Sequence, residues 1–202
     1  MIKIYHSTGT RGFRVIWLCE ELNIDYVVQK VDFSVEYRST KEWLRINPLG
    51  KVPSLRDGNL LMSESCAMMQ YLLDRYGDGR LQPERGSLEY AHFLQWLWFS
   101  EATFARPIGE IVNHRREFPE TKEIPDVIEE MKGRAFKCVL IIDQSLKDDP
   151  YILGKEFSAA DISIGYTLRA AKKILNARMP EKVETYLDSL SNRDGFTIAA
   201  EA

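Results

Sequence analysis

The residues whose types and spacing best suit ligand chemistry lie in two short segments of the first half of the chain. The first, residues 47–55 with the sequence NPLGKVPSL, has a glycine and two prolines within seven residues. Such a segment cannot be the interior of a helix. The second is Ser63-Glu64-Ser65, which begins a stretch with helical periodicity. A rigid turn and a helix N-terminus joined by a hairpin can present backbone groups and N–H donors to one small anionic ligand.

Cysteine and histidine chemistry is poorly supported. The three cysteines, Cys19, Cys66 and Cys138, are odd in number and lack the spacing of a metal site, which favours a reducing, cytoplasmic setting over a disulfide scaffold. We expect all three to pack in the interior. No cysteine lies between residues 5 and 15, so no Cys-x-x-Cys redox centre follows the first strand. The histidines at positions 6, 92 and 114 have no metal spacing either, and we predict no metal site.

Composition favours a folded protein that binds neither nucleic acid nor membranes. The apolar fraction of 45% and the aromatic fraction of 11% are enough for a full core. A formal net charge of −3 gives no general basic field for nucleic acid or anionic lipid. No apolar run approaches the ~18 residues of a membrane helix, and the first residues do not form a signal peptide.

The elements that must position the candidate segments follow from periodicity and turn residues. In the first half we predict the order β-α-β-α-β-β-α, an α/β domain whose first three elements form a βαβ unit with a parallel pair of strands. The predicted strands are 2–6, 26–31, 54–56 and 60–62; the predicted helices follow residue 10, cover 41–46 and run from about 64 to 76; residues 32–40 are expected to be irregular.

The second half has helical periodicity throughout. Residues 77–83 form the best linker, so we predict domains at 1–78 and 84–202. The expected helices run from about 90 to 114, from 127 to 142, from 162 to 171 and from 181 to 190. Ser158 and Asp161 have the spacing of a capping box in front of the third of these helices.

An α/β domain of this order followed by an all-helical domain resembles the cytosolic glutathione transferases. The residues that carry the resemblance are the segment 47–53, the helix start at 63–65, and Phe157-Ser158-Ala159-Ala160-Asp161. It covers nearly the whole chain and implies the glutathione transferase fold, with a thioredoxin-like first domain. It also implies a homodimer with its two-fold axis beside the helix at 64–76 and the first helix of the second domain.

The resemblance implies a glutathione site in the first domain. Pro53 matches the cis-proline of the family, and Val52 would offer its backbone N–H and C=O to the cysteinyl part of glutathione. Glu64 would bind the ammonium of the γ-glutamyl end, while Ser65 and the helix N-terminus would bind its α-carboxylate. Lys51 could pair with the glycyl carboxylate. Alone, each feature would be read as an ordinary turn or helix start; their joint occurrence favours the glutathione site.

Turnover would need a donor to the glutathione sulfur, because a thiol with a pKa of about 8.5 is only slightly ionised at neutral pH. The resemblance places that donor in the turn after the first strand. Thr10 lies four residues before Arg14, where serine-type family members carry their serine, and it is our first candidate. Ser7 and Thr8 are alternatives, and Thr10 could instead cap the following helix. Arg11 could add positive potential, or be a solvated charge.

The electrophile site implied by the family lies in the second domain. Trp98, Phe104 and Pro107 are possible wall residues of an open apolar site, although aromatic residues at helical spacing are more often core. The function implied is transfer of glutathione, as cosubstrate, to a hydrophobic electrophile. The alternatives are a glutathione-dependent disulfide reductase or peroxidase, and a non-enzymatic binding module with the same fold.

Overall fold

The computed structural model describes residues 1–118 and 122–202, which form two compact units. The first contains residues 1–82 together with 191–202, and the second contains residues 83–190. Within the described residues, none of the helices has the length and apolar character needed to cross a membrane.

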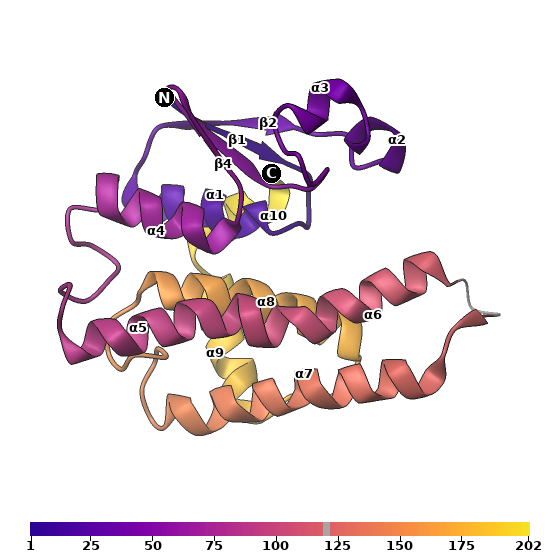
Figure 1. The fold of residues 1–202 in the computed structure, drawn as a ribbon. Helices are drawn as coiled ribbons and strands as arrows, with labels where there is room; N and C mark the ends of the chain where they lie inside the picture. The colour runs from indigo at the N-terminus through magenta and orange to yellow at the C-terminus, as the bar shows by residue number, and fades with distance from the viewer. Residues whose placement is uncertain (119–121) are drawn as a thin grey trace. The chain divides into compact units, whose positions relative to one another are not determined.

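The first unit is built on a four-stranded mixed sheet with the strand order β2-β1-β3-β4. β1 (Ile2–His6) pairs in parallel with β2 (Tyr26–Lys30) and antiparallel with β3 (Ser54–Asp57), which pairs with β4 (Leu60–Met62). The parallel pair confirms the predicted βαβ unit. The helices α1 (Gly12–Leu22) and α4 (Ser65–Tyr76) lie on one side of the sheet (Figure 1).

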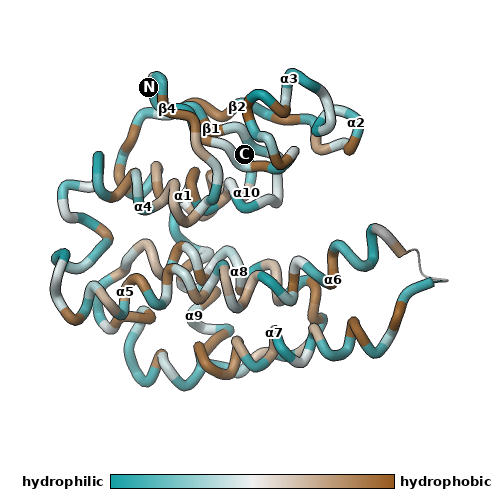
Figure 2. The backbone as a smooth tube through the Cα atoms, in the orientation of Figure 1, coloured by the Kyte–Doolittle hydropathy of each residue, from teal (hydrophilic) through white to brown (hydrophobic). Residues whose placement is uncertain are grey.

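α1 is buried along most of its length, as its apolar sequence requires, and its tube is mainly brown in Figure 2. It ends at Asn23, whose left-handed conformation (φ 53°) closes the helix with its N–H bonded to Cys19 and Glu20 carbonyls. The helix therefore follows residue 10, as predicted, and ends at a residue type that tolerates the left-handed conformation.

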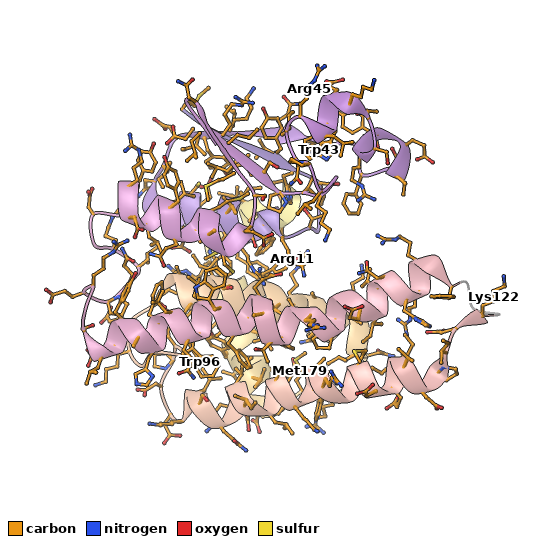
Figure 3. All side chains as sticks on the ribbon, in the orientation of Figure 1. Arg11, Trp43, Arg45, Trp96, Lys122 and Met179 are labelled. Carbon is orange, nitrogen blue, oxygen red and sulfur yellow. The ribbon has the colours of Figure 1, made fainter. Side chains whose placement is uncertain are left out.

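Residues 32–40 are not wholly irregular, contrary to the sequence prediction. They contain the short helix α2 (Val35–Arg38), whose first turn is capped by Ser34, and α3 (Lys41–Leu44) follows with Thr40 as its cap. Helices of four residues are too short to show an apolar repeat in the sequence. Their capping residues are therefore the local signal that marks them. Trp43 points from α3 into the cluster of Tyr5 and Val31, while Arg45 points outward (Figure 3).

The last helix, α10 (Asp194–Glu201), belongs to the first unit. Its Phe196 ring makes edge-to-face contacts with Phe13 and Trp17 of α1, with ring centroids 5.0 and 5.1 Å apart. Arg193 forms a two-point ion pair with Glu21 at 2.7 and 2.6 Å. The predicted domain range 84–202 thus differs from the observed units, because these contacts return the C-terminal residues to α1.

The regular elements described in the second unit are helices, apart from an isolated bridge between Tyr151 and Gly154. The helices are α5 (Leu88–Trp98), the π-helix η1 (Phe99–Phe104), α6 (Ala105–Glu117), α7 (Pro125–Leu146), α8 (Ala159–Leu175) and α9 (Glu181–Ser191, whose last residue falls in the first unit). Figure 2 shows that the end of α6, with His114, Arg115 and Arg116, is hydrophilic.

The long helix predicted to run from residue 90 to 114 is interrupted by the wider turns of η1. Ser100, within η1, donates to the Ser163 carbonyl of α8 at 2.6 Å and lies 2.8 Å from the Thr167 hydroxyl. These buried bonds hold the altered turn against α8. Sequence periodicity could not reveal the interruption, because it depends on hydroxyl groups that lie more than sixty residues apart.

Asp161 confirms the predicted capping box and does more than cap. One carboxylate oxygen accepts from the Ser158 N–H at 2.8 Å and from its hydroxyl at 3.0 Å. The other accepts from the Ile152 N–H at 2.9 Å and from the Tyr186 hydroxyl at 2.7 Å. A fully buried carboxylate therefore joins α8, α9 and the preceding loop.

Candidate functional site

Strand register brings the candidate segments to one end of the sheet, where β1 and β4 end and β3 begins, which we call the sheet edge. Tyr5 of β1 pairs with Ser54 of β3, so the end of β1 lies beside the Val52-Pro53 step that leads into β3. Met62 of β4 pairs with Leu55, so the chain leaves β4 at the same edge and enters α4 there. The turn after β1, the segment before β3 and the start of α4 therefore meet in the first unit.

The segment before β3 is held rigidly. The peptide bond between Val52 and Pro53 is cis. Asn47, buried in front of it, donates to the Ser54 hydroxyl at 3.0 Å and accepts from the Leu49 N–H at 3.0 Å. Lys51 is exposed and Val52 is half-buried, so both remain open to a ligand. Asn47 is a supporting residue that the sequence analysis did not assign, although its position before Pro48 marked it as a turn residue.

Glu64 and Ser65 have different environments. The exposed Glu64 has φ 70° and ψ 103°, a conformation that a residue with a Cβ rarely adopts. Backbone strain of this kind tends to persist where surrounding structure fixes it for function. Ser65 is buried at the first position of α4. The exposed Glu64 side chain therefore belongs to a strained residue directly before a helix N-terminus.

Arg14 of α1 contacts the start of α4. It is fully buried in α1, and its Nη1 donates to the Ser65 hydroxyl at 3.1 Å and lies 3.9 Å from the Cys66 sulfur. A buried guanidinium beside a helix N-terminus adds positive potential that favours an anionic ligand group. From the sequence alone, Arg14 serves only to locate Thr10. An arginine among the apolar residues of α1 was the signal for a buried role.

The turn after β1 carries the three candidate hydroxyl groups, those of Ser7, Thr8 and Thr10. The Thr10 N–H bonds to the Ser7 carbonyl at 3.1 Å, closing a turn in which Gly9 supplies a positive φ of 80°. The Thr10 hydroxyl donates to the same carbonyl at 2.7 Å. The exposed Thr8 donates to a backbone oxygen of Ala202 at 2.5 Å, an interaction that occupies its proton.

Thr10 is not the cap of α1. The cap position is taken by Arg11, and no side chain makes a capping hydrogen bond there. Figure 3 shows Arg11 at the start of this helix, where it is half-buried. The Thr10 hydroxyl therefore does not cap the first turn of α1. It is available to a ligand once its proton turns away from the Ser7 carbonyl.

The predicted wall residues of the electrophile site have unequal exposure. Trp98 is 44% exposed, whereas Phe104 is fully buried and Pro107 is also buried. Phe104 lies against Phe99 in the core of the second unit. Among these three residues, only Trp98 presents surface that a ligand could contact.

A separate cavity of about 340 Å³ lies between α6 and α7 and contains none of the predicted wall residues. Its lining combines the apolar side chains Phe118 and Met131 with the charged side chains Arg106, Glu110 and Arg134.

The three cysteines lie in the interior, as predicted. Cys19, Cys66 and Cys138 are all buried and none forms a disulfide, and burial raises the pKa of the Cys19 thiol to about 12. In the described ranges, no three side chains of His, Cys, Asp or Glu come together as metal ligands would.

Two family models match the chain. The model for the glutathione S-transferase N-terminal domain matches residues 1–74, which contain every candidate residue of the sheet edge. The model for the glutathione S-transferase C-terminal domain matches residues 125–195.

Known proteins resemble the chain over most of its length, and a solved structure shares its fold. Glutathione S-transferase 3 of Schizosaccharomyces pombe is 26% identical, over 100% of this chain and 87% of its own length. The disulfide-bond oxidoreductase YfcG of Escherichia coli is 28% identical, over 81% of this chain and 77% of its own. The structure of glutathione transferase URE2P8 from Phanerochaete chrysosporium with oxidized glutathione superposes with a TM-score of 0.89 at 22% identity, covering 99% of this chain and 93% of the other. With both domain models matched in order, this chain belongs to the glutathione S-transferase family.

Proposed function

We propose that this protein binds glutathione at the sheet edge of the first unit and transfers it to a hydrophobic electrophile. The observation that carries the proposal is that strand register brings together the strand ends next to which Thr10, Val52 and Glu64 lie in the chain. A hydroxyl donor, an exposed backbone segment and an exposed carboxylate before a helix N-terminus are the groups that a thiol peptide with two carboxylates and an ammonium requires.

The mechanism combines positioning with stabilisation of the thiolate. Val52 would pair with the glutathione backbone, Glu64 with the ammonium, and Ser65 and the start of α4 with the adjacent carboxylate. Lys51 would pair with the glycyl carboxylate, and Arg11 would add positive potential. The Thr10 hydroxyl would donate to the sulfur and thereby lower the thiol pKa. The thiolate then attacks the electrophilic carbon, and the leaving group departs with the displaced electron pair.

The first test is retention of the full chain on immobilised glutathione, followed by an assay of conjugation to an aryl halide. We expect both to succeed. Retention without conjugation, together with reduction of a disulfide or hydroperoxide, would favour the second candidate function, a glutathione-dependent reductase. That candidate has support in the relative named a disulfide-bond oxidoreductase. Absence of retention would favour a non-enzymatic module.

Thr10→Ala should raise the pKa of the bound glutathione thiol by about one unit, because one hydrogen bond to a charged group is worth roughly 1.5 kcal/mol or more. The thiolate absorbance of the complex measured against pH reports this value. Thr10→Ser keeps the hydroxyl and is the matched control. If Thr10→Ala has no effect while Ser7→Ala or Thr8→Ala raises the pKa, the donor is one of those residues.

Glu64→Gln should weaken glutathione binding by about tenfold, since it removes the charge that meets the ammonium while keeping the side-chain shape. Calorimetric titration of the variant measures the dissociation constant. Because Glu64 is exposed, we expect the thermal stability to stay close to that of the wild type. Equal affinity in the two proteins would remove Glu64 from the proposed site.

The proposal includes a homodimer whose two-fold axis lies beside α4 and α5, and a cytoplasmic location with a role such as detoxification. Light scattering at micromolar concentration gives the oligomeric state, and a monomeric mass would contradict the dimer.

A further inference from the structure

His6 is a buried group next to the candidate site that the proposed mechanism does not use. It is the last residue of β1 and is 1% exposed. Its Nδ1 lies 3.2 Å from the Thr10 hydroxyl oxygen, the atom proposed to meet the glutathione sulfur.

Gly12 permits this approach. A Cβ built on Gly12, at the start of α1, would lie only 2.3 Å from His6 Nδ1. Gly12 does not have a positive φ, so a glycine here serves the close packing of the imidazole and not the backbone conformation. The ring is therefore fitted between the end of β1, the start of α1 and Thr10.

The hydrogen bonds of Thr10 fix the role of the imidazole. A hydroxyl has a single proton, and Thr10 donates it to the Ser7 carbonyl at 2.7 Å. The contact with His6 then requires an N–H on Nδ1 that donates to Thr10. Burial, followed by the charge of Lys30, lowers the pKa of His6 to about 4, so at neutral pH the ring carries one proton.

The other ring nitrogen supports the same tautomer. His6 Nε2 is buried and has no hydrogen-bond partner within residues 1–118 and 122–202. A buried N–H without an acceptor is rarer in proteins than an acceptor without a donor. The arrangement with the proton on Nδ1 avoids leaving such an N–H.

We propose that His6 is a positioning residue for Thr10, donating from Nδ1–H to the Thr10 oxygen and so holding that hydroxyl ready to donate to the glutathione sulfur. This rests on the proposed function. When glutathione binds, the Thr10 proton turns from the Ser7 carbonyl to the thiolate while His6 keeps the oxygen in place. A hydroxyl that accepts one hydrogen bond is a stronger donor in the next, because the bonds polarise one another. No proton is transferred between His6 and Thr10.

The first experiment measures the tautomer in the full chain without any ligand. The ¹⁵N shifts and couplings of the His6 ring distinguish a proton on Nδ1 from one on Nε2. We expect Nδ1–H in the wild type. A ring protonated on Nε2 would overturn the proposal, whether or not glutathione binds, because it could only compete for the Thr10 proton.

The second experiment measures the pKa of the bound glutathione thiol in two matched variants. His6→Asn places an amide near the position of Nδ1, whereas His6→Gln places it near Nε2. We expect His6→Gln to raise the thiol pKa by roughly half a unit, and His6→Asn to restore most of that loss. Glutathione affinity should change less than twofold in either variant, and circular dichroism checks that both are folded.

Thr10→Ala separates the two levels of the proposal. If Thr10→Ala raises the thiol pKa but His6→Gln does not, the proposed donor stands and the role of His6 is refuted. If Thr10→Ala has no effect on the thiol pKa, Thr10 is not the donor and the role of His6 is refuted with it. If glutathione does not bind, the proposed function itself fails. In the double variant, His6→Gln should add nothing to Thr10→Ala; an additive effect would show that His6 acts independently of Thr10.

Discussion

Asp161→Ala is expected to lower the free energy of unfolding by about 4 kcal/mol, within the range for breaking a buried polar network. The substitution leaves four donors without their acceptor: two N–H groups, of Ile152 and Ser158, and two hydroxyls, of Ser158 and Tyr186. Because these donors belong to the start of α8, the middle of α9 and the loop before α8, the second unit should lose its cooperative unfolding transition.

Urea denaturation followed by circular dichroism measures this loss. Tyr186→Phe removes one of the four bonds and should cost about 1 kcal/mol. The exposed Asp149 provides the control, since Asp149→Ala should change the stability by less than about 0.5 kcal/mol. A loss below about 1 kcal/mol for Asp161→Ala would mean that the carboxylate does not hold these segments together.

Phe196→Ala is expected to cost about 3 kcal/mol of unfolding free energy. The ring is 7% exposed and fills the space between Phe13 and Trp17, so its removal leaves a cavity and two broken aromatic contacts. α10 should then detach from α1, because an eight-residue helix is unstable alone.

Hydrogen exchange of the α10 amides, together with urea denaturation, tests this expectation. Ile198→Ala on the same helix is the matched control, since Ile198 is 43% exposed and should be nearly neutral. Retained protection of α10 in the Phe196 variant would show that its other contacts, among them the ion pair between Arg193 and Glu21, hold the helix without the ring.

Local signals made much of the first unit predictable. Asn23 ends α1, and the turn at Asp57-Gly58 sets the β3–β4 hairpin, with Gly58 at φ 55°. Each signal acts within a few residues of the feature that it determines. The same is true of the Ser158–Asp161 capping box.

The supporting contacts of the candidate site could not be predicted in this way. Arg14 and Ser65 are 51 residues apart in the chain, and their hydrogen bond depends on how α1 and α4 pack. His6 and Gly12 are close in sequence, yet only the packed structure shows that the glycine makes room for an imidazole. α10 itself was not predicted, since the last expected helix ends near residue 190, and its contacts with α1 join residues that are far apart in the chain.

The return of α10 to α1 has a consequence for how the protein is made. During synthesis the chain leaves the ribosome from its N-terminus, so α1 emerges long before residues 191–202. Until residues 191–202 have been made, the surface of Phe13 and Trp17 that Phe196 covers in the folded protein is not covered by α10. The unit that carries the candidate site is thus the first to begin folding and the last to be completed, after the whole helical unit has been translated.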